Sequence, residues 1–596
     1  MTSSSVQGLF AAAERAFVER SYSEARRHLI AVEQCQLRHP VVYHLRALVE
    51  RELGDFPRAQ KYFEAATQLA PHDPQIANNF GNLLGDMGDE AAALAAYDRA
   101  LRLAPDFPDA ALNRAITLYR LKLYAEARAA LRALAAEHAG DVRIWNALAA
   151  VEKDVGEAAA AAAAFDRALE ISPTDAIALQ GRARMSLERA EDDVFERYAA
   201  ALTVAPDEPQ LIFEQTDARL AAGDEGALQD FAAFVHQRPA WTYGQIELAR
   251  MLWENRRDET FADHVKALLR KEPGRRDLWT QLVSLLAGTG HYSEATDAAH
   301  DAWIALGGDP KLMLLEAVHA GRAGDIGRAE TIFASLPVDL PGRAAHESVH
   351  RIRQDRLKLA KSLIDGALAE NPADIGSWAV AELIYRKVGD ERADWLSRRD
   401  GLVQASDLAL DPESLETIKA LLLRLHSQSR QRVGQSVRSG TQTRWRLFDR
   451  TEPEIAELRS AIECAIQHYV AALPPEDERH PLLRHRHSAL AIVGSWSIRL
   501  SGSGYHVSHI HPEGLISSAC YFEVPASAAS SQEGRLELGR PPRNLLLDLE
   551  PLHVVTPRPG RLVLFPSYLH HGTRPFTSGE RLTVAFDVNR HLAPDG

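Results

Sequence analysis

The stretch Ala91–Pro105, AAALAAYDRALRLAP, is repeated 68 residues later as AAAAAAFDRALEISP, which ends at Pro173. In both copies small alanines, one aromatic residue (Tyr97 or Phe165) and a closing proline stand in register. The same closing proline recurs, at spacings of 33 or 34 residues or twice 34, at Pro71, Pro105, Pro173, Pro206, Pro239 and Pro273. Self-similarity at a fixed period of this length predicts an array of stacked helical units.

This pattern resembles the tetratricopeptide repeat, a helix–turn–helix unit of about 34 residues. Small residues let two helices approach closely, the aromatic fills the gap between them, and proline ends the second helix because its ring clashes with the preceding turn. The clearest units are 74–107 and 142–175, whereas the signature weakens from about 275 to 400, where we still expect helix pairs. The sequence therefore predicts an all-α solenoid over residues 1–405.

An array of this kind leaves a curved surface free for binding. We expect it to capture a protein or peptide partner, which includes self-association as a homodimer; a passive spacer arm is the alternative. The formal net charge is −14, and an acidic chain lacks the basic face that nucleic-acid binding needs. The charge favours basic segments in the partner.

Composition excludes several other classes. The three cysteines, Cys35, Cys464 and Cys520, lie far apart and form no CxxC pair, so neither a disulfide framework nor a cysteine zinc site is expected. No apolar run is long enough to cross a membrane, and the first residues lack the pattern of a secretory signal. These features together predict a cytoplasmic protein without a membrane partner.

The character of the chain changes near residue 405. Asp411–His426 predicts a helix within a connecting segment, 406–429. The polar, arginine-containing stretch Ser427–Thr443 is either a disordered linker or a structured loop, and Glu452–Leu473 predicts a further helix.

Strand signals follow these helices. Leu490–Leu500 and Gly560–Phe565 alternate apolar with polar residues or are rich in β-branched ones. Several short strands bounded by glycine and proline predict a jelly-roll domain, or double-stranded β-helix, with flanking helices over residues 430–596.

Histidine is concentrated in this part: residues 485–591 hold nine of the 24 histidines of the chain. In HVSHIHP, an extended strand would place His509 and His511 on one face, and Pro512 disfavours a helix there. A third ligand would come from His570 or His571 in LFPSYLHHGTRPF. Arg581 follows ten residues after His571 and opens RLTVAFDV.

The order HIHPEG, FPSYLHHGTRPF and RLTVAFDV resembles the iron(II) and 2-oxoglutarate oxygenases. This order is most similar to a bacterial group of these oxygenases that is often fused to tetratricopeptide repeats. The upstream segments QSVRSGTQT and RWRLF also resemble that group. The resemblance covers residues 430–596 and carries no information on the substrate.

The resemblance implies a role for each matching residue. His509 and His571 are the expected iron ligands, with His571 chosen over His570 because the ligand follows FPSYL by two residues. His511 occupies the place that a carboxylate usually holds, so it is either the third ligand or a residue behind a water ligand.

The resemblance also implies how 2-oxoglutarate is bound. Arg581 would hold its far carboxylate in a two-pronged geometry, and Thr583 would assist from the same strand face. Tyr521 and Tyr505 are weaker candidates for the cofactor pocket. No catalytic residue is expected beyond the metal and co-substrate ligands.

The implied activity is hydroxylation of a protein or peptide side chain by an iron(II)- and 2-oxoglutarate-dependent dioxygenase. The alternatives are a binding scaffold with an inactive barrel, a three-histidine metal dioxygenase that does not use 2-oxoglutarate, a zinc hydrolase and a glycosyltransferase. Arg581 argues against the other metal enzymes, since they need no dicarboxylate clamp. The absence of alternating β and α segments argues against the glycosyltransferase.

Overall fold

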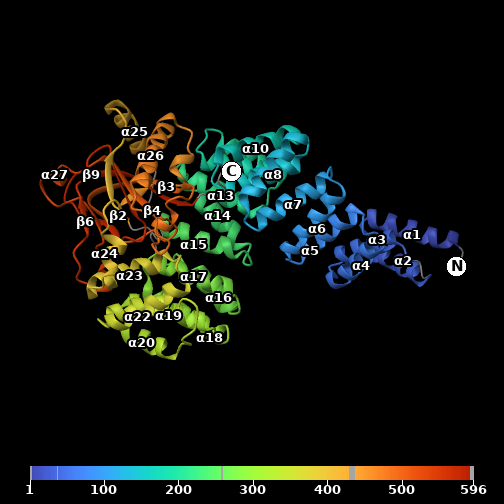
Figure 1. The fold of residues 1–596 in the computed structure, drawn as a ribbon, viewed down its shortest axis with the longest axis horizontal. Coiled ribbons are helices and arrows are strands. Elements are labelled where there is room, and N and C mark those ends of the chain that lie inside the picture. Colours follow the sequence, from blue (N-terminus) through green and yellow to red (C-terminus); the bar gives the residue numbers. More distant parts are fainter. Residues whose placement is uncertain (1–2, 36–37, 257–258, 428–436, 591–596) are drawn as a thin grey trace. The chain divides into compact units, whose positions relative to one another are not determined.

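The computed structural model describes residues 3–35, 38–256, 259–427 and 437–590. Figure 1 shows helices throughout the blue, green and yellow part of the chain and strands in its orange and red part. The described residues divide into two compact units, one before and one from Ser186 onward. None of the helices in these described ranges is long and apolar enough to cross a bilayer.

The first unit consists of paired antiparallel helices. Their bounds are α1 Ser3–Val18, α2 Tyr22–Gln34, α3 Pro40–Glu52, α4 Phe56–Leu69, α5 Pro74–Asp86, α6 Glu90–Leu103, α7 Pro108–Arg120, α8 Tyr124–Glu137, α9 Val142–Asp154 and α10 Ala158–Ile171, followed by α11 Ala176–Glu188, which crosses the division between the units. Helix α4 ends two residues before Pro71, α6 two residues before Pro105, and α10 two residues before Pro173. The predicted role of the closing prolines is confirmed.

Close approach of the helices in a pair depends on glycine. A Cβ atom built on Gly81 of α5 would lie 2.6 Å from the Tyr97 ring of α6, and one on Gly181 of α11 only 2.1 Å from the Phe165 ring of α10. Because either methyl would overlap the ring, the aromatic of one helix requires a glycine on its neighbour. The small-residue and aromatic pattern in the sequence is therefore the packing contact of each repeat.

The second unit continues the array. Its helices are α12 Val194–Val204, α13 Pro209–Ala221, α14 Ala227–His236, α15 Thr242–Arg256, α16 Asp263–Lys271, α17 Arg276–Gly288, α18 Tyr292–Ala305, α19 Pro310–Ala323, α20 Ile326–Ser335, α21 Arg343–Arg353, α22 Leu357–Glu370, α23 Ile375–Val388 and α24 Arg392–Ser397. The helix pairs expected from 275 to 400 are confirmed. Pro310 breaks the spacing because it opens α19 instead of closing a helix, a position where proline is well tolerated.

Two antiparallel sheets follow the array. The larger sheet has the strand order β1-β7-β4-β9-β3-β2 and the smaller one β6-β5-β8. The strands are β1 Gln404–Asp407, β2 Val437–Gln442, β3 Leu490–His506, β4 Ile516–Glu523, β5 Leu536–Leu538, β6 His553–Val555, β7 Arg561–Pro566, β8 His571–Thr573 and β9 Glu580–Arg590. This is the predicted jelly-roll arrangement.

Flanking helices α25 (Pro412–His426) and α26 (Pro453–Ala472) confirm the two predicted ones, and the short elements η1 Leu447–Asp449, η2 Leu483–His485, α27 Ser527–Ser530 and η3 Arg543–Leu545 complete the fold. Part of the polar stretch is structured, since residues 437–442 form β2 and pair with β3. Its residues 428–436 lie outside the described ranges. Strand β1 was not predicted; it borders the large sheet and pairs with β7.

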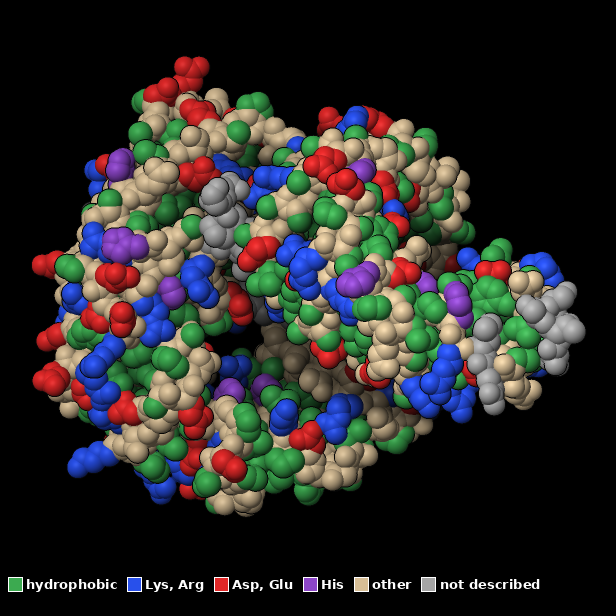
Figure 2. All heavy atoms as spheres, turned by 45° about the vertical axis from the view of Figure 1, so that its right-hand side comes forward, with side chains coloured by type: hydrophobic (Ala, Val, Ile, Leu, Met, Phe, Trp, Pro, Cys, Tyr) green, Lys and Arg blue, Asp and Glu red, His purple; other side chains and the backbone are tan. Residues whose placement is uncertain are grey.

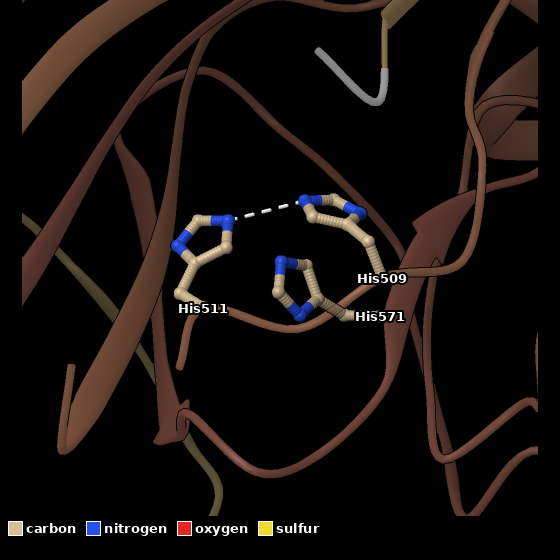
Figure 3. A group of neighbouring side chains, drawn as sticks. All are labelled: His509, His511 and His571. Atoms are coloured by element: carbon tan, nitrogen blue, oxygen red, sulfur yellow. Dashed lines mark hydrogen bonds between the residues drawn. The ribbon is translucent and has the colours of Figure 1, made fainter. Parts of the chain in front are cut away.

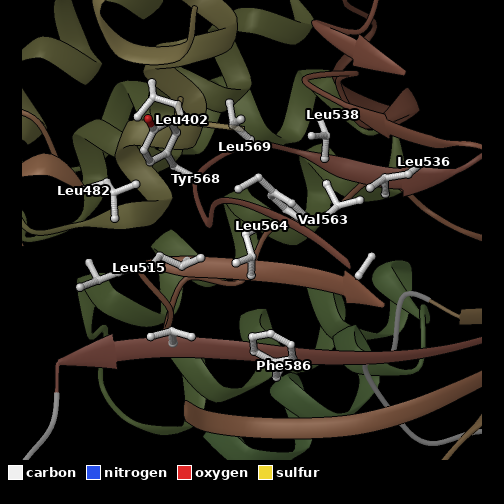
Figure 4. Close-up of a cluster of buried hydrophobic side chains, with 14 of the residues drawn as sticks. Leu402, Leu482, Leu515, Leu536, Leu538, Val563, Leu564, Tyr568, Leu569 and Phe586 are labelled. Carbon is white, nitrogen blue, oxygen red and sulfur yellow. The ribbon is translucent and has the colours of Figure 1, made fainter. Parts of the chain in front are cut away.

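One hydrophobic core extends from the last repeats into the sheets. It contains Ile352 of α21, Leu396 of α24, Leu421 of α25 and Val588 of β9, among many others. Figure 4 shows part of this core, where Tyr568 lies beside Leu402, and Leu564 and Phe586 extend from separate strands of the large sheet. This core continues across residues 405 and 430. Packing therefore marks no boundary at either residue, and the two domain limits stay a prediction.

Charged side chains are distributed without segregation on the surface in view. Figure 2 shows acidic and basic side chains intermixed with hydrophobic ones. The excess of 82 acidic over 68 basic residues therefore does not form one continuous acidic face on this side.

Candidate metal centre

Three histidines meet where the loop after β3 runs beside β8. His571 is the first residue of β8, and His509 forms a single β-bridge with it through backbone N–H···O contacts of 3.0 and 2.9 Å. We expected a continuous strand through His509 and His511. Instead β3 ends at His506 and β4 begins at Ile516, because the chain turns after Pro512, where Gly514 N–H donates to the His511 carbonyl.

The three imidazoles converge, as Figure 3 shows. One potential ligand atom from each of His509, His511 and His571 lies within 4.8 Å of the other two. Each Nδ1 faces an acceptor: Val507 O at 2.8 Å from His509, Leu569 O at 3.1 Å from His571, and Asp587 at 2.6 Å from His511. An N–H on every Nδ1 leaves every Nε2 as a lone pair.

This tautomer fits a cation between the rings. The Nε2 atoms of His509 and His511 are 3.1 Å apart, and two lone pairs at that distance repel unless a positive ion lies between them. Metal-binding histidines commonly donate their other ring N–H to a carbonyl or carboxylate, which fixes the ring orientation. The donor set thus suits a divalent transition metal.

Burial keeps two of the three rings, His509 and His571, neutral. It lowers the pKa of His509 to about 3, helped by the charge of His511, and lowers the pKa of His571 well below its usual value. Metal ligands must be deprotonated to bind. Two of the three rings are therefore ready to bind metal at neutral pH and well below it.

A carboxylate is present, but behind a ligand. Asp587 on β9 accepts from His511 Nδ1 through both oxygens, at 2.6 and 2.8 Å. Ser517 Oγ donates to the same carboxylate at 2.8 Å and lies 2.9 Å from Ser567 Oγ. These bonds orient His511 and increase its basicity as a ligand.

A pocket of about 260 Å³ adjoins the histidines. Arg581 and Thr583 line it, and both side chains are 2% exposed. Arg581 has no carboxylate within ion-pairing distance among the described residues, and its Nε has no hydrogen-bond partner there. An unpaired buried charge destabilises the folded state. We therefore expect the guanidinium to bind an anionic ligand.

The two tyrosines differ. Tyr521 is fully buried, its ring centroid lies 5.0 Å from the Arg581 guanidinium, and its hydroxyl has no partner in the described part of the chain. Burial raises the pKa of Tyr521, so it can act as a neutral hydrogen-bond donor. Tyr505 does not line the pocket; its neighbour His506 does, as the alternation of side chains along β3 requires.

Of the two adjacent histidines, His570 is buried and does not belong to the group of three converging rings. It is 6% exposed, and its Nδ1 has no partner among the described residues. Burial, followed by the charge of Arg386 on α23, lowers its pKa to about 4. Because side chains alternate along an extended chain, His570 lies on the opposite face from His571, and on that face it is buried.

The sequence analysis missed two site residues, Trp496 and Asp587. Trp496 lies 5.4 Å from His511 ring to ring. His506, expected at a strand edge or the rim of the pocket, lines the pocket and stacks on His509 at 5.9 Å. Asp587 had a readable signal: it follows Arg581, Thr583 and Ala585 at steps of two along one strand, hence on one face. Trp496 had none, because a tryptophan in a strand is most often core.

Known families match both parts of the chain. The profile described as "Putative 2OG-Fe(II) oxygenase" matches residues 494–587, which include all three histidines and Arg581. Two tetratricopeptide-repeat profiles match residues 41–73 and 78–142. The chain therefore carries tetratricopeptide repeats and a C-terminal domain that matches the family described as "Putative 2OG-Fe(II) oxygenase".

More distant similarities cover only portions of the chain. Protein FlbA of Caulobacter vibrioides is 27% identical over 193 residues, which make up 32% of either protein, so the match spans about a third of the length of FlbA. Among solved structures, yeast Tom70 is 12% identical and matches 66% of this chain and 98% of its own, with a TM-score of 0.34. MamA from Desulfovibrio magneticus RS-1 is 19% identical, matching 28% of this chain and 96% of its own, with a TM-score of 0.27.

Proposed function

We propose that the protein is an iron(II)- and 2-oxoglutarate-dependent dioxygenase that hydroxylates a side chain of a protein or peptide held by the repeats. One observation carries the proposal: three histidines turn their Nε2 lone pairs toward one point, beside a pocket lined by a buried, unpaired Arg581. A metal and an anion would satisfy both features at once.

Each residue then has a defined part. His509, His511 and His571 would hold iron(II), and Asp587 keeps His511 in the orientation and tautomer that a ligand needs. Arg581 would bind the far carboxylate of 2-oxoglutarate, with Thr583 and the hydroxyl of Tyr521 as further donors. Bound iron(II) would supply the oxidising chemistry: 2-oxoglutarate would lose carbon dioxide and become succinate with one atom of dioxygen, and the other oxygen atom would be inserted into a substrate C–H bond.

The remaining elements supply positioning. The apolar pocket residues Ile498 and Ala585 exclude water from the reacting groups. The repeats would bring the substrate, since helical arrays of this type present extended binding surfaces. A cytoplasmic location and a homodimer remain part of the proposal.

The test is an anaerobic titration of the iron(II)-loaded protein with 2-oxoglutarate, monitored by the visible charge-transfer band of a metal-chelated keto acid. His571→Ala and Arg581→Ala are the informative variants. His553→Ala is the matched control, because His553 is an exposed histidine on β6.

A band in the wild type and in His553→Ala, lost in His571→Ala and weakened in Arg581→Ala, supports the proposal. If iron bound but no band appeared, 2-oxoglutarate would be excluded as the co-substrate. That result would favour a three-histidine dioxygenase that does not use 2-oxoglutarate, the alternative that the all-histidine ligand set supports. Failure to bind iron would sink the proposal as a whole.

A further inference from the structure

Two arginines of the array lack the partners that their neighbours have. Arg328 on α20 pairs with Asp297 at 2.9 Å, and Arg343 on α21 pairs with Glu347 at 3.0 Å. By contrast, Arg322 on α19 and Arg353 on α21 have no carboxylate oxygen within 4.0 Å among the described residues. Both therefore carry positive charge that the described part of the chain does not neutralise.

Their guanidinium groups are held in place. Arg353 Nε donates to the Asn544 carbonyl at 3.1 Å, and its Nη1 lies 3.1 Å from where a Cβ of Gly321 would stand. Arg322 lies 5.6 Å from the ring centroid of Tyr292, in cation–π range. A fixed guanidinium loses less conformational entropy on binding an anion.

Two histidines lie on the same helix faces as the two arginines. His319 precedes Arg322 by one helical turn, and His346 precedes Arg353 by two turns. We call Arg322, Arg353, His319 and His346 the cationic cluster. Spacings of three and seven residues place each pair on one face of its helix.

The charges within the cationic cluster act on one another. Burial, followed by the charge of Arg322, lowers the pKa of Arg353 to about 10 and that of His319 to about 4. Burial, followed by the charge of Arg322, also lowers the pKa of His346, and the nearby carboxylate of Asp374 offsets only part of this. That carboxylate is engaged in capping α23 through Gly376 N and Ser377 N. A bound anion would relieve the repulsion between the two arginines.

We propose that Arg322 and Arg353 of the cationic cluster bind an acidic segment of the protein substrate, in contrast to the basic partner that the net charge of the whole chain favours. His346, as a neutral imidazole, lies about 10 Å along α21 from Arg353 at 1.5 Å per residue, so a segment that reaches both is longer than one carboxylate or phosphate. The cluster also adjoins the oxygenase domain, because Asn544 belongs to η3 between β5 and β6 of the smaller sheet. This inference names the substrate class and so rests on the proposed function.

The experiment measures binding without chemistry. The full-length protein, with no added iron or 2-oxoglutarate, is titrated into fluorescein-labelled deca-glutamate at low ionic strength, and fluorescence anisotropy gives the Kd. Arg322→Ser and Arg322→Glu are the test variants, since Arg322 is exposed. Arg398→Ser is the matched control, because it removes an equally exposed arginine that pairs with Asp394 inside α24.

We expect saturable binding that weakens about tenfold in Arg322→Ser, the loss of one charge contact of about 1.4 kcal/mol, and that is abolished in Arg322→Glu. Arg398→Ser should bind like the wild type. Equal affinity of Arg322→Ser and wild type would overturn the inference, as would binding of inorganic phosphate without binding of deca-glutamate. Since no iron is present, these outcomes are independent of the charge-transfer titration.

Discussion

At the scale of single residues, the site differs from the usual two-histidine, one-carboxylate iron centre by moving the carboxylate outward. Asp587 contacts His511 instead of pointing at the metal. Three neutral ligands leave the metal more positive than a set with one carboxylate would. The Asp587 carboxylate, hydrogen-bonded to His511, restores part of the missing negative charge by making the imidazole a stronger electron donor.

Asp587→Asn should therefore weaken iron(II) binding by about 10- to 100-fold, the usual effect of removing a partner of a metal-bound histidine. Anaerobic competition against a chelator of known affinity measures this. Glu513→Gln is the control, since Glu513 is exposed and only two residues from His511. If Glu513→Gln weakened binding and Asp587→Asn did not, the ligand assignment would be wrong.

Arg581 permits a second prediction at this scale. Arg581→Lys keeps a positive charge but loses the planar fork that grips a carboxylate with two parallel bonds. We expect the Kd for 2-oxoglutarate to rise by about tenfold or more, with iron(II) affinity unchanged. Isothermal titration of the iron-loaded protein is the measurement, and Arg558→Lys, on an exposed arginine paired with Asp407, should bind like the wild type.

At the scale of elements, His480 connects the helices to the sheets. Its Nε2–H donates to Leu396 O of α24 at 3.2 Å, and its Nδ1 accepts from the N–H groups of Leu482 and Leu483. Tyr568 O–H donates to the same Leu396 carbonyl at 2.6 Å. These bonds require a neutral imidazole, and burial lowers the pKa of His480 to about 4.

The pKa of His480 predicts how stability depends on pH. Since the ring titrates near 6.5 when unfolded, the unfolded chain binds a proton that the folded chain refuses, so stability is full above pH 6.5 and falls as the pH drops toward 4. Between pH 7.5 and 5 this should cost about 2 kcal/mol. Urea unfolding at both values measures it.

The control for that prediction is His480→Gln, which cannot titrate in this range. Its loss of stability between the two pH values should be smaller than that of the wild type by the same amount. Identical losses in both proteins would show that other groups, such as the similarly buried His426, account for the pH dependence.

The sequence predicted most elements and missed those that depend on tertiary contacts. The alanines, the aromatic residue and the closing proline recur at a fixed period, so the repeats could be predicted. Strands β3 and β7 could also be predicted, from Leu490–Leu500 and Gly560–Phe565. Strand β1 could not, because QASD becomes a strand only by pairing with β7. The three histidines were found through a family resemblance, but their convergence depends on the bridge between His509 and His571, which local sequence does not encode.

At the scale of the molecule, the last repeats take part in building the site. Arg386 of α23 donates to Gly539 O at 2.6 Å, and Gly539 N–H donates to His570 O at 2.6 Å, next to His571. Ser508, next to His509, donates through Oγ to Arg540 O at 2.5 Å. One loop, held by an array helix, thus supports both segments that carry the metal-binding histidines.

This support predicts which fragments will bind metal. The second compact unit begins at Ser186, so residues 186–596 should fold and bind iron(II) with the affinity of the full chain. Residues 430–596 should not, because they lack Arg386 as well as Ile352, Leu396 and Leu421 of the shared core, each worth about 2–5 kcal/mol if truncated to alanine. The measurements are circular dichroism melting and iron titration of both fragments. Cooperative unfolding and tight iron binding by residues 430–596 would contradict the prediction. That result would mean that the C-terminal domain folds without the repeats, and that the array only captures the partner.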